Sequence, residues 1–388
     1  MDSQIPIDDR GLRGDRPAKR AAFVVERAKR LGFDLCGVAP AEDFPELARV
    51  PEWLERGYAG EMRYLADPRR ATPAAAMPGA RSVIVCALNY NTAQPQSTES
   101  AASLDRGLGW ISRYAWGEDY HRVLLEKLDA LIDELRGEMR GRDGESFEAR
   151  AYVDTGPIVE RVAAKHAGLG WLAKNTCLIN SEIGSWLFLG VILTTLELAP
   201  SLATAETPPA DLCGNCRACL DACPTQALVE PYVLDARLCI SYLTIELRGA
   251  IPEKLREPIG RNVFGCDICQ DVCPWNHRAP VGAAAEFEPR AALGVKTAGG
   301  ESERLVAPRL EFLLELTENE FRETFRSSAV RRTKWRGLLR NACVAAGNSG
   351  LAAGDAGYGE IVRRLERLAA SDDSLVAEHA QWALARIQ

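Results

Sequence analysis

The chain has 388 residues, of which 47% are hydrophobic and 26% are charged, a composition typical of a folded, water-soluble protein. Its formal net charge is −7, which excludes a general attraction to polyanions and requires any nucleic-acid partner to bind a local basic patch. Its 12 cysteines occur without an export signal, so they indicate metal binding or redox chemistry rather than disulfides.

The first 200 residues alternate patterns typical of helices and strands. Residues 1–20 predict a polar tail, and because they lack the apolar core of a secretory signal we expect a cytoplasmic protein. Residues 18–33 and 118–139 each have the apolar spacing of an amphipathic helix. The second helix is predicted to bury one apolar face, made of Leu124, Leu128, Leu131, Ile132 and Leu135.

Continuous apolar runs in the same region predict buried strands. "SVIVCALNY" covers residues 82–90, and "SWLFLGVILTTLELA" covers residues 185–199. The longer run is shorter than the ~20 residues of a membrane-spanning helix, so no membrane association is expected. Residues 147–156, "FEARAYVDTG", predict a strand that ends in a turn. These elements together predict an α/β domain over residues 21–200.

The spacing of eight cysteines is the most specific signal in the sequence. The first four follow C-x2-C-x2-C-x3-C-P, the pattern of bacterial ferredoxins, in which the fourth cysteine of each motif ligates the other of two [4Fe-4S] clusters. The second motif lacks its local first cysteine, and Cys239 is the natural replacement. The predicted ligand sets are therefore Cys213, Cys216, Cys219 and Cys273 for one cluster, and Cys239, Cys266, Cys269 and Cys223 for the other.

Residues 201–280 are thus predicted to form a ferredoxin-like two-cluster module. Two zinc sites of four thiolates each are the alternative. The other four cysteines lie in apolar surroundings and are predicted to be buried, inert thiols: Cys36, Cys86, Cys177 and Cys343.

The remainder of the chain predicts a linker and then helices. Residues 281–303 are rich in Ala and Gly and predict a linker or an irregular crossover. Residues 304–388 predict short stacked helices, of which "LLRNACVAAGN" resembles a HEAT-type repeat. Because so few repeats do not fold alone, we expect them to dock on the body of the protein. The predicted fold class is α+β and multidomain.

The domain before the clusters is large enough to hold an electron acceptor, but common cofactor motifs are absent from it. No G-x-G-x-x-G follows a strand and no P-loop is present. Asp154, at the end of a predicted strand, is a candidate ligand-site carboxylate, and a helix-capping Asp is the alternative. Residues 112–121 and 168–180 are weaker candidates, with a surface helix start and a plain loop as their alternatives.

Seven motifs together resemble one family, the epoxyqueuosine reductases. They run in order from about Phe33 to Asn348 and are "RYAWGEDYH", "VDTGPIVER", "GWLAKNTCLIN", "GSWLFLG", "CISYLTIE", "GCDICQDVCPWN" and "RRTKWRGLLRNACVAAGN". The resemblance implies an iron–sulfur enzyme that uses cobalamin to reduce epoxyqueuosine to queuosine at the wobble base of tRNA. It also implies an α/β cobalamin-binding domain and a HEAT-like carboxyl-terminal region that helps to hold tRNA.

The resemblance further implies roles for individual residues. Asp154 matches the proton-donating carboxylate of the family, and we expect burial under the corrin to raise its pKa. Cobalamin contacts are expected in the segments around Asp154 and around five further residues: Arg113, Lys174, Asn175, Leu178 and Ser241. The sequence "DYHRVL" departs from the D-x-H-x-x-G of proteins that ligate cobalt through histidine, so base-off cobalamin without a histidine ligand is predicted.

A basic stripe between residues 322 and 340 is the expected contact for the tRNA anticodon stem-loop. Its candidate residues are Arg331, Arg332, Lys334, Arg336 and Arg340. A flavodoxin or ferredoxin system is the expected electron donor, and a monomer is expected. Two other functions remain open at this point: a reductive dehalogenase and a non-enzymatic ferredoxin-type electron carrier.

Overall fold

The computed structural model describes residues 16–99, 105–142, 146–202, 209–296 and 302–387. Residues 1–15 of the predicted tail lie outside these ranges. Residues 16–20, which we assigned to the tail, instead open helix α2 (Arg16–Arg30), whose Val24 and Ala28 side chains are buried. Among the residues described, no helix combines the length and the apolar character needed to cross a bilayer.

A four-stranded antiparallel sheet organises the amino-terminal half. Its strands are β1 (Leu35–Pro40), β2 (Ser82–Asn89), β7 (Leu187–Thr194) and β4 (Ala149–Tyr152), in that order. Adjacent strands pair antiparallel throughout. The strands predicted at residues 82–90, 147–156 and 185–199 are therefore confirmed.

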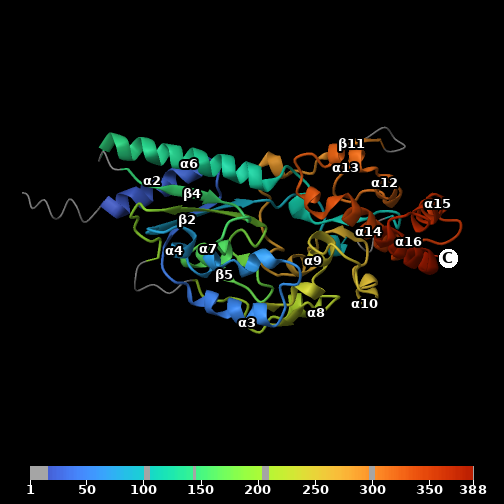
Figure 1. Ribbon diagram of the computed structural model, residues 1–388. Helices are drawn as coiled ribbons and strands as arrows, with labels where there is room; N and C mark the ends of the chain where they lie inside the picture. Colours follow the sequence, from blue (N-terminus) through green and yellow to red (C-terminus); the bar gives the residue numbers. More distant parts are fainter. Residues whose placement is uncertain (1–15, 100–104, 143–145, 203–208, 297–301, 388) are drawn as a thin grey trace, which may run out of the picture.

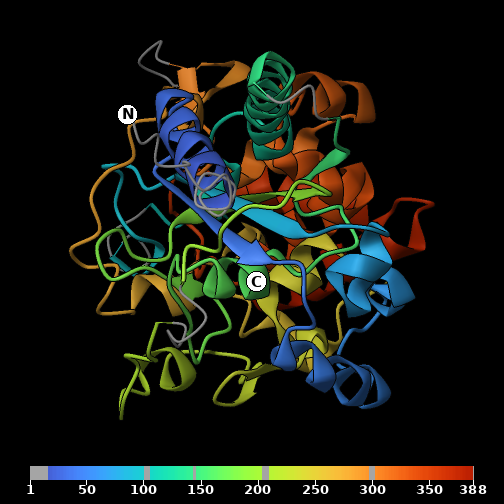
Figure 2. The same cartoon turned by 90° about the vertical axis from the view of Figure 1, so that its left-hand side faces the viewer.

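Alternation along β2 explains why its sequence is apolar throughout. Val83, Val85 and Ala87 face one layer, which contains helix α7 (Glu160–His166). Ile84, Cys86 and Leu88 face the other layer, which contains α2 and α6 (Tyr120–Arg142). The sheet is thus covered on both sides, with α6 lying along one face (Figure 1) and α2 beside it (Figure 2).

Helix α6 anchors this layer through the face that its sequence predicted. Leu124, Leu128 and Leu131 are fully buried in the packing against the sheet. Burying a leucine side chain contributes about 1.5–3 kcal/mol, so this face supplies a large part of the stability of the layer.

The cysteine motifs lie on short helices and loops beside the sheet. Helix α8 (Ala218–Asp221) lies within the first motif and packs against α11 (Ile268–Asp271) of the second. The other elements of this region are β5 (Trp171–Leu172), β6 (Leu178–Ile179), β8 (Leu228–Glu230), β9 (Val233–Leu234), α9 (Ile240–Ile245) and α10 (Glu253–Arg256). Two short helices, α3 (Val50–Glu55) and α4 (Pro73–Ala76), precede β2.

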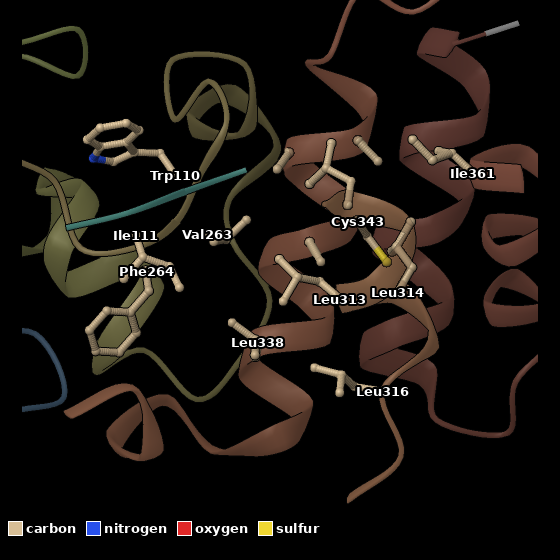
Figure 3. Packing of buried hydrophobic residues seen from close by; sticks show 14 of the residues in the cluster. Trp110, Ile111, Val263, Phe264, Leu313, Leu314, Leu316, Leu338, Cys343 and Ile361 are labelled. Atoms are coloured by element: carbon tan, nitrogen blue, oxygen red, sulfur yellow. The ribbon is translucent and has the colours of Figure 1, made fainter. Parts of the chain in front are cut away.

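The carboxyl-terminal helices share a core with an early part of the chain. Strand β3 (Trp110–Ile111) pairs parallel with β10 (Asn262–Phe264), and both pack against the carboxyl-terminal helices (Figure 3). Those helices are α12 (Leu310–Glu315), α13 (Glu318–Thr324), α14 (Lys334–Gly347), α15 (Tyr358–Ala369) and α16 (Ser374–Ile387). This packing crosses the boundary that we drew at residue 200 and seats the helical end on the body.

The predicted linker at residues 281–303 is in part a hairpin. Strands β11 (Ala291–Lys296) and β12 (Ser302–Arg304) pair antiparallel. Residues 297–301 lie outside the described ranges. Just before the hairpin, the segment packs closely on the body, since a Cβ on Gly117 would lie 2.3 Å from the carbonyl oxygen of Glu286.

Candidate active site

The eight motif thiols gather in two groups. Burial raises the pKa of Cys273, and the nearby charges of Cys213 and Cys216 raise it further. Burial likewise raises the pKa of Cys266, together with the charges of Cys239 and Cys223. These neighbours are the ones that crosswise sharing of the two motifs predicts, and the exact ligand sets remain a prediction.

Each group of thiols has its own apolar surroundings. Cys213 and Cys273 lie with Trp171 and Trp275, whose rings meet edge to face at 5.0 Å. Cys239 and Cys266 lie against a separate cluster that includes Ile240 and Leu243. Cys216 is the exposed thiol of the first group. The first group therefore reaches the surface, whereas Cys239 and Cys266 pack against the second, interior apolar cluster.

A cavity of about 1150 Å³ lies between the sheet domain and the cysteine module. This volume is at the upper end of the range for small-molecule and cofactor sites. The sheet domain contributes residues 45–70 and 154–165 to its wall, and the cysteine module contributes Asp211 and residues 230–234. Apolar side chains form much of the lining, namely Leu65, Ile158, Val162, Leu172 and Leu234.

Asp154 projects into this cavity from the turn after β4. Its backbone is left-handed, with φ of 57°, a conformation that Asp tolerates better than most residues. Gly156 permits the tight turn, since a Cβ there would lie 2.5 Å from the Tyr152 side chain. The Asp154 side chain is 67% exposed to the cavity, and its Oδ2 accepts a hydrogen bond from Tyr120 Oη at 2.9 Å.

The protein groups around Asp154 lower the pKa of its carboxyl. Burial among the surrounding protein atoms raises this pKa, but hydrogen bonds from His121 and Tyr120 and the charges of His121 and Arg332 outweigh burial. The net direction is below the ordinary value for Asp. The expected rise of this pKa under a bound corrin stays a prediction, and the sequence did not show that a cationic imidazole stands beside the carboxylate.

His121 is held between two carboxylates. Its Nδ1 lies 2.8 Å from Asp119 Oδ1, and its Nε2 lies 3.6 Å from Asp154 Oδ2. Burial lowers the pKa of His121, but hydrogen bonds to Asp119 and Asp154 raise it to about 9. The imidazole is thus protonated at neutral pH. The stacked ring of Tyr120, at 4.1 Å between ring centres, fixes its orientation.

A second, smaller pocket of about 550 Å³ opens on the other side of His121. Asp119 and His121 form one part of its wall, and the start of α14 forms another. Its cationic residues are Arg322, Arg331, Arg332 and Lys334. Because Asp154 lines the large cavity and lies against His121, the charged pair stands between the two hollows.

Most of the other predicted cobalamin contacts do not reach the cavity with their side chains. The Arg113 guanidinium is buried, donates to carbonyl oxygens of Thr92 and Gln94, and stacks 4.6 Å from the Trp116 ring. This prediction was wrong for the side chain, because internal acceptors already engage it. Leu178 is likewise buried in the sheet core.

Lys174 itself does not line the cavity, but residues next to it in the sequence do. Ala173 and Thr176 line the wall, while Lys174 Nζ donates to the carbonyl oxygens of Gly214 and Cys216 at 2.5 and 2.9 Å. Asn175 Nδ2 donates to the Cys269 carbonyl oxygen at 3.2 Å. Burial raises the pKa of the Cys239 thiol, and hydrogen bonds from Ser241 oppose part of that rise. These three polar residues thus support the thiols.

The five residues of the predicted basic stripe lie in three different environments. Arg331, Arg332 and Lys334 line the second pocket. Arg336 instead pairs with Asp373 beside α16. Arg340 is fully buried and donates to the carbonyl oxygens of Leu243, Leu247 and Gly249, so its prediction as an RNA contact was wrong.

The free cysteines were predicted correctly only in part. Cys86 and Cys343 are buried, whereas Cys36 and Cys177 are half-buried. Burial raises the pKa of the Cys177 thiol to about 11, and the charges of Cys273 and Cys219 contribute. This thiol therefore lies near the cysteine module rather than in an unrelated part of the core.

Two family models match the chain. The model described as "4Fe-4S double cluster binding domain" matches residues 212–276, which include all eight motif cysteines. The model described as "Epoxyqueuosine reductase QueG, DUF1730" matches residues 70–155, which end directly after Asp154. The cysteine module is therefore of the iron–sulfur type, and the zinc alternative is not supported.

Whole-chain relatives point to the same family. An epoxyqueuosine reductase of Gloeobacter violaceus is 44% identical over 340 residues, covering 86% of this chain and 98% of the relative. The chain belongs to the epoxyqueuosine reductase family. The reductase of Escherichia coli is 38% identical over 92% of this chain and 86% of its own length.

A solved structure of an epoxyqueuosine reductase has the same fold. It is 32% identical to this chain, covers 94% of this chain and 89% of its own, and aligns with a TM-score of 0.79. That protein was crystallised with an epoxyqueuosine-modified tRNA-Tyr stem loop. The family thus includes a member whose structure holds this modified RNA.

The sequence missed two residues of the site. His121 was considered as a cobalt ligand and as part of the candidate segment 112–121, but not as a partner of Asp154, although its neighbours Asp119 and Tyr120 indicated a polar cluster. Glu160 was not singled out, although it lies six residues after Asp154 in the same motif and lines the cavity. A carboxylate within an otherwise apolar "GPIVERV" segment was the available signal.

Proposed function

We propose that this chain reduces epoxyqueuosine to queuosine at the wobble position of tRNA, as an oxidoreductase. The observation that carries the proposal is the His121–Asp154 pair, which stands between a cofactor-sized cavity and a basic pocket in a member of this family. The reaction needs electrons, which would arrive through the large cavity, and an RNA base, which would enter from the basic pocket.

Cobalamin fits the large cavity. The cavity has the volume of a large cofactor site, apolar side chains that suit the faces of a corrin, and the cysteine module as part of its wall. The residues that would hold the corrin are those of segments 154–165 and 172–176 and of the 230–234 loop. When bound, cobalamin supplies a low-valent metal that delivers electrons to the epoxide carbon.

The electron route follows the two groups of thiols. Cys216 is exposed, so a donor of the flavodoxin or ferredoxin type has access to the first cluster from solvent. Cys239 and Cys266 lie in the interior apolar cluster, which keeps water away from the second cluster. The reduction potentials of iron–sulfur clusters run from about −700 to +450 mV, and the reduction requires clusters from the low-potential end of this range.

The chain's own residues supply protons to the epoxide oxygen. Loss of that oxygen as water takes two protons. Asp154 is ionised, because its pKa is lowered, while His121 carries a proton at neutral pH. We infer that Asp154 delivers a proton that it receives from His121 Nε2, 3.6 Å away, so that the pair acts together as the general acid.

His121 is unsuited to a second role as a cobalt ligand. Its Nδ1 is engaged by Asp119 and its Nε2 faces Asp154, and the residue lines the second pocket rather than the large cavity. This supports the proposal of base-off cobalamin without a histidine ligand.

The second pocket is suited to the anticodon loop. A wobble base must leave the stack to reach a buried cofactor, and cations at the pocket mouth bind the phosphates on either side of it. Lys334 begins α14 and Arg331 lies in the turn just before it, and both line the pocket with His121. The HEAT-like assignment of this helical end, a monomeric state and a cytoplasmic location remain proposals from the sequence.

The test combines composition with turnover. Anaerobically reconstituted protein is expected to hold about eight iron atoms, as two four-iron clusters require, and one cobalt per chain. With a chemical reductant it should convert epoxyqueuosine tRNA to queuosine tRNA and leave a chlorinated phenol unchanged. Dehalogenation of the phenol without tRNA turnover, or failure to load cobalamin, would exclude the proposed function.

A further inference from the structure

Glu160 lines the large cavity, yet the proton route through Asp154 and His121 does not use it. The residue opens α7, and its Oε1 atom is buried. Within the described part of the chain, this oxygen has no hydrogen-bond partner. Buried polar atoms in native proteins are almost always hydrogen-bonded, so an exception at a cavity wall indicates a donor that arrives with the ligand.

Other carboxylates of the same cavity already accept hydrogen bonds from donors of the protein. Glu46 accepts from Lys165 Nζ at 2.6 Å and contacts His166 Nε2 at 2.9 Å. Asp154 accepts from Tyr120. Asp211 accepts from the backbone N–H of Cys213 at 2.8 Å. Glu160 therefore differs from its neighbours in presenting a carboxyl oxygen without a protein donor.

The cations beside Glu160 are engaged elsewhere. Arg70 Nη1 donates to the carbonyl oxygen of Ile158 at 3.3 Å, and Arg161 Nη1 donates to the carbonyl oxygen and the hydroxyl of Thr176. Burial raises the pKa of Glu160 to about 7, and the charge of Asp154 contributes in the same direction. The carboxyl is thus held where ionisation is costly unless a further donor is present.

We propose that Glu160 accepts a hydrogen bond from a primary amide on the edge of the bound corrin, and so fixes the corrin relative to Asp154. This inference rests on the proposed function. Primary amides surround the corrin ring, and they are neutral donors. A neutral amide N–H supplies the missing donor, and the largely apolar lining of the cavity favours a neutral group over a charged one.

The test measures cobalamin binding rather than turnover. Hydroxocobalamin is dialysed to equilibrium against the full chain with both clusters reconstituted, for wild type, E160Q, E160M and E52Q. Glu52 lines the same cavity but is exposed and paired with Arg56, so E52Q is a control for the same change of charge. E160M is expected to bind about tenfold more weakly than wild type, and E52Q is expected to match wild type.

A second set of ligands tests the amide directly. In the monocarboxylic derivatives of cobalamin, one primary amide is replaced by a carboxylate. Wild type should bind one of these derivatives at least tenfold more weakly than the others, because that carboxylate would face Glu160. E160Q should lose this discrimination, since its own amide N–H donates to the carboxylate. E160Q preserves the shape of the side chain, so this readout holds even if E160M fails to fold.

The pH dependence of binding gives an independent readout. An amide donor prefers the ionised carboxyl, so the pKa of Glu160 falls on binding and affinity rises as pH increases through about 7. The charged side chains with the largest effect on Glu160 are Asp154, Arg70 and Arg161, and Asp154 stays ionised in this interval because its pKa is lowered. The profile should be flat in E160Q.

The outcomes separate this inference from the function on which it rests. If E160Q and E160M bind cobalamin and each derivative as wild type does, with the same pH profile, the inference is overturned and the proposed function stands. If these variants instead weaken only the binding of epoxyqueuosine tRNA, the oxygen serves the substrate and the inference is also overturned. If wild type does not bind cobalamin, both fail.

Discussion

The two hollows of the site differ in how their charges are neutralised. In the large cavity, carboxylates such as Glu46 and Asp154 have internal partners, and apolar side chains form much of the wall. In the second pocket, Arg331 and Lys334 make no ion pair within the described ranges, although Arg332 pairs with Glu246. The first hollow suits a large, largely buried ligand, and the second suits phosphates that remain hydrated.

Under the proposed function, this difference assigns chemistry and RNA affinity to separate residues. His121 and Asp154 lie where the hollows meet, so substitutions there should affect the reaction and leave binding on both sides intact. Substitutions at the start of α14 should do the opposite. The following experiments test that division, in order of decreasing expected effect on turnover.

The strongest test of the division is D154N. It preserves the size of the side chain but removes the group that passes a proton, so single-turnover reduction of epoxyqueuosine tRNA should fall by about 10³-fold. Cobalamin loading and tRNA affinity, measured on the same sample, should not change. Turnover near the wild-type rate would remove Asp154 from the reaction.

His121 should affect turnover through its proton. H121Q is expected to lower the rate by about 10²-fold. In wild type, His121 has its pKa raised to about 9, so the proton is present below that pH and the rate should fall as pH rises through about 9. This alkaline decline should be absent in H121Q. An unchanged decline would assign it to another group.

The double variant R331Q/K334Q should change RNA binding and not chemistry. Each phosphate contact with a single strand contributes about 0.7 to the slope of log K against log salt, so losing two contacts should reduce the slope by about 1.4. The rate at saturating tRNA should match wild type. A slope equal to that of wild type would move the RNA site away from this pocket.

Arg340 is the matched control from the same stripe. R340M leaves buried carbonyl oxygens without a donor, and we expect it to lower the free energy of unfolding by about 2–4 kcal/mol. Denaturant unfolding measures this loss. At a temperature where the variant is folded, the salt slope should be that of wild type. A reduced slope would contradict the interior role of Arg340.

Sequence reasoning worked where a local pattern determines the structure. Continuous apolar runs predicted β2 and β7, and one apolar face predicted α6, because burial in or on a sheet requires these patterns. The thiol spacing predicted an iron–sulfur module, since ligand geometry constrains neighbours along the chain.

Sequence reasoning failed where contacts with distant segments determine whether a side chain is buried or how its pKa shifts. Arg113 and Arg340 have the same side chain as a surface arginine, and only the carbonyl groups brought to them from elsewhere in the chain make them interior. The pKa of Asp154 depends on His121, which lies 33 positions earlier in the sequence. Contacts of this kind carry no signal in the residues next to either partner.

Helix α14 has a mechanical consequence beyond its charges. Seven residues after Lys334, Asn341 Nδ2 donates to the carbonyl oxygens of Thr244 and Val263 at 2.7 and 2.8 Å, and Gly265, next to Cys266, donates its N–H to Thr244 Oγ1 at 2.9 Å. The helix that carries the basic residues and the loop that carries a cluster cysteine are thus tied into one rigid unit. Under the proposed function, the distance between the iron–sulfur module and a docked nucleotide is therefore set by the fold before the nucleotide binds.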